Sequence, residues 1–293
     1  MGIDYFTTPK RPIGVKWVYK TKFKSTGKVD RFKRYPYEHT LYIKFKCGEY
    51  ILIVCLYVDD LIFTGNNPEL IYEFREAMIS KFEMIDLGLM SYFLGIEVSQ
   101  LDNGIFISQK KYASDILKRF NMDKAKSIFT PLEEKLKLVR DGTGDLVDAT
   151  YFRKLVGSLR YLTSTRPDIT YRVGLISRFM ETPRQSHLQA AKRILRYIQD
   201  THTDGIFYLK TNDSSLVGFT DSDWAGDTIQ RKSTSSYAFY LRSSVFSWSS
   251  KKQQVIALST AEAEYMTTTS SAAQALWLRR MLEFLQHKQD NPQ

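Results

Sequence analysis

Apolar and polar positions in the first third of the chain follow the patterns of β-strands. Residues 40–45 alternate between apolar and polar side chains, and residues 50–57 form a continuous apolar run, which is typical of a buried strand. A second apolar run covers residues 61–64 and ends at a Gly-Asn-Asn-Pro sequence that favours a turn. Because only residues 58–60 separate the two runs, the pattern predicts a tight hairpin.

Helical periodicity and further strand patterns alternate along the rest of the chain. Apolar residues recur at helical spacing over residues 68–82, 109–120, 150–163, 168–180, 185–199 and 260–286. Strand patterns cover residues 92–98, 105–107, 206–209, 216–220, 236–241 and 245–249, and residues 121–149 have the composition of a surface connection. This order predicts an α+β chain in which a second domain, made of strands and a closing helix, begins near residue 205.

The composition fits a folded protein and excludes several kinds of site. The 293 residues are 43% hydrophobic, which is enough for the core of one large domain or two ordinary ones. Two cysteines, Cys47 and Cys55, exclude a disulfide scaffold, and four widely separated histidines exclude a helix-borne zinc site. No apolar run approaches the ~20 residues of a membrane span, and residues 1–10 lack the apolar core of a secretory signal. We therefore expect a soluble intracellular protein, cytoplasmic or nuclear, that does not enter a membrane.

The net charge of +10 is distributed unevenly along the chain. Residues 1–50 hold twelve Lys or Arg against four Asp or Glu, and residues 151–200 hold ten against three. Residues 51–104, between these blocks, hold two against nine. An acidic centre between basic segments suits a protein that holds cations against a nucleic acid, although a solvated surface of uneven charge is an equally good interpretation of the charge alone.

Asp59 and Asp60 lie between the two apolar runs of the predicted hairpin, at a rigid edge of the sheet. Adjacent carboxylates at such a position suit Mg²⁺, which proteins hold with one or two carboxylates together with substrate phosphates. Two such ions can activate an attacking hydroxyl and stabilise the leaving oxygen. The alternative is an ordinary Asp-Asp turn that only solvates the hairpin.

A second pair of carboxylates, Asp221 and Glu264, comes from the C-terminal third of the chain. Asp221 directly follows the apolar strand pattern at 216–220, and Glu264 lies in the first turns of the predicted final helix. Ser259 is placed to cap this helix, with Glu262 favourable in its first turn. The alternatives are therefore helix capping for Glu262 and a solvated helix face for Glu264.

Several motifs in this order resemble one family. Tyr57-Val58-Asp59-Asp60 resembles the Tyr-x-Asp-Asp box of reverse transcriptases, and the surrounding sequence is similar to the copia type of LTR-retrotransposon polyprotein. The resemblance is carried by residues 12–20, 37–42, 56–65, 92–98, 157–162 and 165–169, and it runs on to the C-terminus. It implies an RNA-directed DNA polymerase with RNase H, acting on RNA, DNA or RNA–DNA hybrids. It also implies that Asp59 and Asp60 of the polymerase site and Asp221 and Glu264 of the RNase H site bind Mg²⁺.

The resemblance also predicts a domain organisation and its gaps. We expect an N-terminal extension at 1–12, partial reverse-transcriptase fingers and palm at 13–108, a helical thumb-like region at 109–204 and a truncated RNase H-like domain at 205–293. The strand with the first metal-binding aspartate is missing where Arg34 meets Tyr35, and the chain stops before two further RNase H ligands. We therefore expect an inactive or nearly inactive remnant. The alternatives are a non-catalytic nucleic-acid-binding module and a relic with no selected function.

Basic residues are the candidates for contact with nucleic acid. Lys16, Lys20 and Lys22 alternate with aromatic residues in a predicted basic hairpin at 13–34, which suits contact with a single strand. Arg160 and Arg166 lie in the thumb-like region, where phosphate contact fits the resemblance. The alternatives are a hairpin whose aromatic residues pack in the core and helix faces that are simply solvated.

Overall fold

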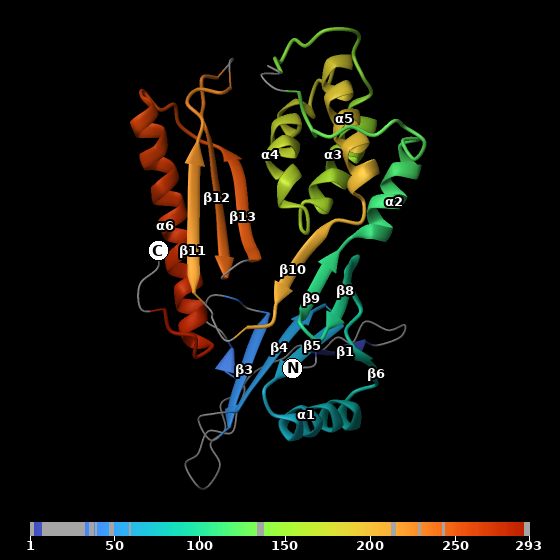
Figure 1. The fold of residues 1–293 in the computed structure, drawn as a ribbon, viewed down its shortest axis with the longest axis vertical. Helices are drawn as coiled ribbons and strands as arrows, with labels where there is room; N and C mark the ends of the chain where they lie inside the picture. Colours follow the sequence, from blue (N-terminus) through green and yellow to red (C-terminus); the bar gives the residue numbers. More distant parts are fainter. Residues whose placement is uncertain are drawn as a thin grey trace. The chain divides into compact units, whose positions relative to one another are not determined.

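The computed structural model divides into two compact units, residues 1–91 and 92–293 (Figure 1). It describes residues 3–7, 33–34, 38, 40–46, 50–58, 60–133, 138–211, 215–227, 230–241 and 244–289. The basic hairpin predicted at 13–34 lies outside the described residues, except for its last two positions. Among the helices in these ranges, none combines the length and the apolar character that crossing a membrane requires.

The first unit is built on a six-stranded antiparallel sheet. Its strands are β1 (Ile3–Thr7), β2 (Lys33–Arg34), β3 (Leu41–Lys46), β4 (Tyr50–Tyr57), β5 (Asp60–Gly65) and β6 (Ile85–Leu89), in the spatial order β2-β3-β4-β5-β1-β6. The predicted strands at 40–45, 50–57 and 61–64 are confirmed as β3, β4 and β5. Five residues of the expected N-terminal extension form β1, which lies between β5 and β6.

Helix α1 (Pro68–Lys81) follows β5 and confirms the predicted helix at 68–82. It begins after Asn67, whose side chain accepts a hydrogen bond from the Leu70 amide at 2.9 Å. Leu70 and Met78 pack into the same core as Leu52 of β4 and Phe63 of β5. Although β4 is an unbroken apolar run, its burial alternates along the strand, so one of its faces is covered more fully than the other.

The second unit begins with a four-stranded antiparallel sheet in the order β10-β9-β8-β7. Its strands are β7 (Tyr92–Phe93), β8 (Ile96–Leu101), β9 (Gly104–Ser108) and β10 (Gly205–Leu209). The predicted strand patterns at 92–98 and 105–107 are found in β7, β8 and β9, and β8 pairs with β9 as a hairpin. Residues 205–209, expected to open the C-terminal domain, instead pair with β9 and close this sheet.

Between β9 and β10 the chain forms a helical layer. It contains α2 (Lys110–Arg119), α3 (Ala149–Leu162), α4 (Pro167–Ile176), the 3₁₀ turn η1 (Ser177–Phe179) and α5 (Gln185–Thr201), which confirm the four helices predicted there. The apolar residues that recur at helical spacing in α5 are buried in one core with Phe152 and Leu159 of α3; they are Leu188, Ala191, Leu195 and Ile198. The connection at 121–149 is not purely a surface segment, because Met122 and Leu132 belong to this core.

His187 fastens this connection to the start of α5. Its Nδ1 accepts a hydrogen bond from the Arg184 amide at 3.0 Å, and its Nε2 lies 2.8 Å from the Val139 carbonyl oxygen, to which it donates. The ring is fully buried and stacked on Phe179, with 4.0 Å between centroids. Burial lowers the pKa of this imidazole because it disfavours the charged form. The neutral ring can accept from the Arg184 amide and donate to the Val139 carbonyl oxygen at the same time.

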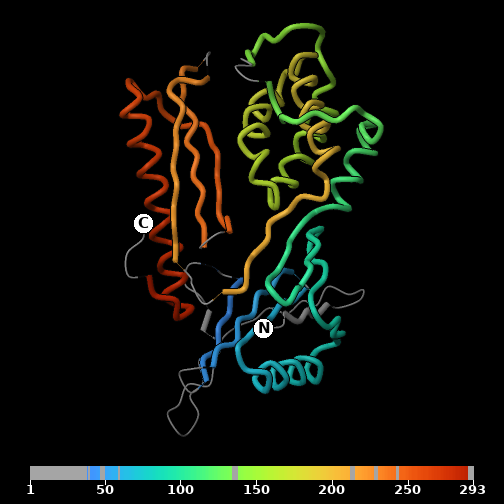
Figure 2. The backbone as a smooth tube through the Cα atoms, in the orientation of Figure 1, coloured from blue at the N-terminus to red at the C-terminus, as the bar shows by residue number. Residues whose placement is uncertain are grey.

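The C-terminal part of the second unit is a three-stranded antiparallel sheet covered by one long helix. The sheet has the order β11-β12-β13, with β11 (Leu216–Ser222), β12 (Thr234–Leu241) and β13 (Ser244–Lys252). Helix α6 (Thr260–Phe284) runs back along β11 and β12 (Figure 2). Leu216 and Phe239 pack against Leu278 and Leu282 between these two layers. The opposite side of the sheet faces α4 through β13.

Candidate functional site

The first carboxylate pair occupies the turn between β4 and β5, as the sequence predicts. Tyr57 is paired with Asp60 across this turn, so the hairpin closes in two residues. Asp60 opens β5 with a partly exposed side chain, whereas Asp59 lies outside the described residues. The structure therefore places Asp60, partly exposed, at the hairpin end of two interior strands, and the role of Asp59 as a metal ligand stays a prediction.

Val58 adopts a left-handed backbone conformation in this turn, with a φ of 56°. Its side chain is 82% exposed, so no packing compensates for the conformation. A β-branched residue at positive φ is strained, because its Cβ approaches the following carbonyl group. Strained residues cluster at functional sites, and this one directly precedes the two aspartates.

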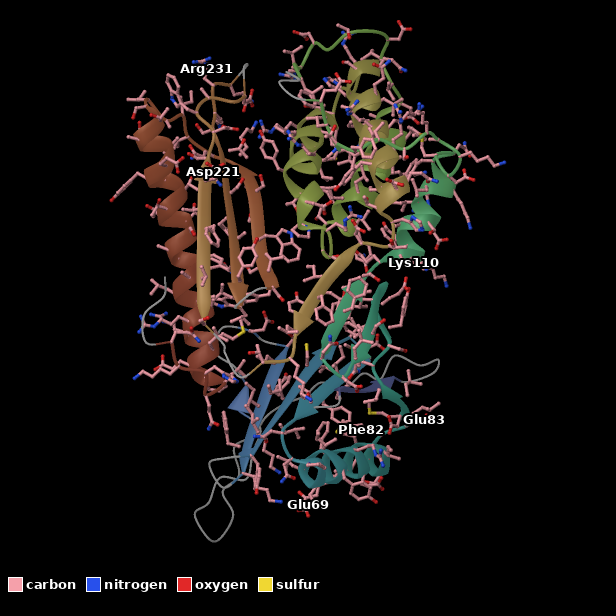
Figure 3. All side chains as sticks on the ribbon, in the orientation of Figure 1. Glu69, Phe82, Glu83, Lys110, Asp221 and Arg231 are labelled. Atoms are coloured by element: carbon pink, nitrogen blue, oxygen red, sulfur yellow. The ribbon has the colours of Figure 1, made fainter. Side chains whose placement is uncertain are left out.

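Helix α6 brings Glu264 to the end of β11. This helix runs antiparallel to β11, so that Glu264 in its first turns reaches the last residue of the strand. The Oε1 of Glu264 accepts a hydrogen bond from the Ser222 amide at 3.2 Å, one residue beyond Asp221 (Figure 3 shows Asp221 at this end of β11). Both carboxylates are exposed. Glu264 therefore lies at the strand end that bears Asp221, and the role of the two carboxylates as Mg²⁺ ligands stays a prediction.

The neighbouring acidic residues have structural roles. Asp223 Oδ1 accepts hydrogen bonds from the Thr234 amide at 2.7 Å and from the Gly226 amide at 3.3 Å, and it thereby shapes the loop after β11. Glu262 accepts from the Leu258 amide at 2.6 Å, while Ser259 caps α6 through the Glu262 amide. The helix-capping interpretation of Glu262 is confirmed.

Asp221 also lines a cavity of about 440 Å³ between the sheet and α4. Aromatic rings from the sheet and from α4, among them Phe219, Trp248 and Tyr171, form much of its wall. Burial raises the pKa of the Tyr171 hydroxyl, and the charges of Asp223 and Asp221 raise it further. The sequence gives no signal for Tyr171, because it reaches the site from a helix about fifty residues earlier.

The two tryptophans near this site are held by hydrogen bonds to backbone carbonyls. Trp224 Nε1 donates to Ala257 at 3.3 Å, and Trp248 Nε1 donates to Thr163 at 3.2 Å. The second bond ties β13 to the end of α3. Both rings are therefore held in place by the fold, although Trp224 is 49% exposed.

Arg166 is not available to nucleic acid, which corrects its prediction as a phosphate contact. Its side chain is 3% exposed. Its guanidinium group donates to both carboxylate oxygens of Asp168, at 3.0 and 2.7 Å, and to the carbonyl and hydroxyl oxygens of Thr201, at 2.6 and 2.8 Å. The preceding Thr165 is buried and donates to Gln109 at 2.9 Å. The Thr-Arg-Pro-Asp motif is thus a structural joint between α3, α4 and α5.

Of the other basic residues predicted to contact nucleic acid, the structure describes only Arg160. Arg160 projects from α3 into solvent, where a phosphate can reach it. Lys16, Lys20 and Lys22 lie outside the described residues, so their contact with nucleic acid stays a prediction. The described residues contain no group of three or more His, Cys, Asp or Glu side chains close enough to share one metal ion.

The sequence of this chain is similar to reverse transcriptases and to retrotransposon polyproteins. Residues 26–134 match the family described as reverse transcriptase (RNA-dependent DNA polymerase). The retrovirus-related Pol polyprotein from transposon RE1 of Arabidopsis thaliana is 42% identical over 235 residues, which are 80% of this chain and 16% of that polyprotein. The corresponding polyprotein from transposon TNT 1-94 of Nicotiana tabacum is 36% identical over 274 residues, 90% of this chain and 20% of the polyprotein.

A shorter relative is covered almost completely. An uncharacterized mitochondrial protein of Arabidopsis thaliana is 38% identical over 226 residues, which are 77% of this chain and 94% of that protein. The chain thus spans 16% to 20% of the length of the polyproteins and nearly all of this shorter protein.

Proposed function

Because the chain belongs to the family of Pol polyproteins from copia-type retrotransposons and carries part of their reverse transcriptase domain, we propose that it is a nucleic-acid-binding remnant of that machinery. In this proposal it binds RNA, DNA and above all RNA–DNA hybrids, and has little or no catalytic activity. In this proposal the fingers and palm comprise residues 13–108, the thumb-like region 109–204 and the RNase H-like domain 205–293, although the first strand of this last segment, β10, is part of the sheet with β9.

The observation that carries the RNase H-like assignment is the hydrogen bond between Glu264 and the Ser222 amide, because it brings a helix carboxylate to the strand end that bears Asp221. These two residues would hold one Mg²⁺, and Asp59 with Asp60 would hold another in the palm. When bound, Mg²⁺ stabilises negative charge on the reacting phosphate. The contribution of the chain itself is to hold the exposed carboxylates of Asp221 and Glu264 at one end of β11 and the partly exposed carboxylate of Asp60 at the start of β5.

In this proposal weak polymerase activity follows from the size of its ligand set, which Asp59 and Asp60 make up alone because the strand with the first metal-binding aspartate is missing between Arg34 and Tyr35. A two-metal mechanism needs several carboxylates that fix both ions relative to the attacking and leaving oxygens. A pair of carboxylates binds a hydrated Mg²⁺ but leaves its position largely to water and substrate. Binding of nucleic acid has no such requirement, since it follows from basic residues such as Arg160.

Hybrid cleavage tests the proposal with a matched control. A fluorescent RNA–DNA hybrid is incubated with the full chain over a range of Mg²⁺ concentrations, using Asp221→Asn, Glu264→Gln and Glu283→Gln, the last an exposed carboxylate on the same helix. We expect binding by all four proteins, and only trace cleavage, lost in the first two variants and retained in the third. Multiple turnover by the unaltered chain contradicts the proposed inactivity. Absence of hybrid binding contradicts the proposed function and favours a relic.

A further inference from the structure

The outer edge of β11 carries backbone groups that the fold leaves unpaired. In the described part of the C-terminal sheet, β11 pairs with β12 alone. The Asp223 amide donates toward β12, to the Thr234 carbonyl. Because successive amides of a strand point to opposite edges, those of Leu216, Gly218, Thr220 and Ser222 point away from β12.

Side chains satisfy the two ends of this edge but not its centre. The Leu216 amide donates to the Gln289 side chain at 2.9 Å, and the Ser222 amide donates to Glu264 at 3.2 Å. No described residue accepts a hydrogen bond from the Gly218 or Thr220 amide. Phe219, between them, is 61% exposed. The result is a short open window at the centre of the strand, the kind of edge that accepts another strand.

The window is complementary to itself in the antiparallel direction. If Phe219 faces Phe219 of a second copy as a non-hydrogen-bonded pair, Gly218 of each copy lies opposite Thr220 of the other. These two flanking positions then exchange N–H···O bonds in both directions, using every free amide of the window. The next pair along the edge would be Leu216 with Ser222, whose amides already have partners. The extent of pairing is therefore defined by the side-chain caps.

The charges near the edge favour the same orientation. Exposed Asp221 and Glu264 lie at the Ser222 end of β11, whereas exposed Lys288 lies at the Leu216 end, next to Gln289. Antiparallel pairing places the acidic end of one copy beside the basic end of the other, and does so twice. Parallel pairing would place like charges together.

We propose that β11 is a dimerisation edge, at which two copies of this chain pair antiparallel about Phe219. The edge is independent of the proposed catalytic remnant, since its hydrogen bonds come from the backbone. Thr220→Pro removes one outward amide from each copy and keeps the backbone bonds to β12, although it loses the bond from the Thr220 hydroxyl to the Ser236 carbonyl oxygen at 3.2 Å. Proline is tolerated at such edge positions. Thr220→Ser keeps both the amide and a hydroxyl, so it is the matched control.

Sedimentation equilibrium of the full chain from about 1 to 200 μM tests the dimer, a range that brackets weak association. We expect a dimer for the unaltered chain and for Thr220→Ser, and a dissociation constant at least about tenfold higher for Thr220→Pro, because half of the inter-copy hydrogen bonds are lost. Phe219→Lys should also dissociate the dimer, because it brings two like charges together at an exposed position. This variant tests the dimer even if the proline variant does not fold. A monomeric unaltered chain, or a Phe219→Lys variant that associates as strongly as the unaltered chain, overturns the proposal.

Cross-linking tests the register. In a background with Cys47→Ser and Cys55→Ser, we expect Phe219→Cys to form a disulfide between copies, since Cα atoms of a non-hydrogen-bonded pair lie about 4.5 Å apart, within disulfide range. Thr220→Cys should not, because its counterpart is displaced by two residues along the second strand. Cross-linking at 220 but not at 219 contradicts the register and overturns the proposal.

Discussion

Replacement of Arg166 by alanine tests the buried joint between α3, α4 and α5. The substitution leaves Asp168 without its bidentate partner and the Thr201 hydroxyl oxygen without a donor, while the Thr201 carbonyl oxygen keeps its bond from the Asp204 amide at 3.0 Å. Removal of one member of a buried ion pair costs about 3–5 kcal/mol. Asp168 is 37% exposed and keeps its bond from the Tyr197 hydroxyl at 2.9 Å, so part of its charge stays solvated. We therefore expect a loss of about 2–3 kcal/mol in the free energy of unfolding.

Urea unfolding followed by tryptophan fluorescence measures this loss, and Arg160→Ala on the exposed face of α3 is the control. Arg160→Ala should change stability by no more than about 0.5 kcal/mol and weaken hybrid binding. Burial by itself would raise the pKa of Asp168, but Arg166 and the Tyr197 hydroxyl lower it. The stabilisation is therefore complete at neutral pH and is lost as the pH falls below about 4. The reasoning is refuted if Arg166→Ala is as stable as the unaltered chain and loses hybrid binding instead.

Three further predictions follow from single residues. Because the folded state lowers the pKa of His187, the stabilising effect of this residue is present above about pH 6.5 and is lost as the pH falls below that value. In a pH series of urea unfolding, the unaltered chain should therefore lose stability more steeply toward pH 5 than His187→Gln does. Equal slopes for the two proteins would contradict this. Val58→Asn should stabilise the chain by about 1 kcal/mol in urea unfolding, since asparagine tolerates the left-handed conformation, and a decrease would show that the turn is not strained. Phe152→Ala, at a fully buried position, should cost about 3–5 kcal/mol, against no more than about 0.5 kcal/mol for exposed Leu276→Ala. A similar loss in both variants would contradict the position of the core.

The sequence predicts those elements whose signal is local. The β4–β5 hairpin and the caps of α1 and α6 depend on neighbouring residues, so apolar periodicity and capping residues are sufficient to find them. The strands β1 and β6 have no such signal. β6 contains Gly88 at a φ of 74°, lacks a β-branched run, and pairs with β1 more than seventy residues earlier in the chain.

The role of Arg166 shows the same limit at a candidate site. An arginine before a Pro-Asp pair has the same local pattern on a surface and in a core, and the partner that decides the matter, Thr201, is 35 residues away. Glu264 and Asp221 are likewise distant in sequence. The approach of Glu264 to the Ser222 amide depends on α6 running back along β11, which the spacing in the sequence does not indicate.

Fluorescence anisotropy of a labelled RNA–DNA hybrid, titrated with the full chain at several salt concentrations, tests the central claim most directly. We expect binding whose affinity falls steeply with salt, with a logarithmic slope of about −0.9 for each phosphate contacted. We also expect that Asp221→Asn combined with Glu264→Gln leaves this binding intact, and that Arg160→Ala makes the slope shallower. Hybrid binding that is absent at low salt, or that disappears with the two carboxylates, would contradict the account.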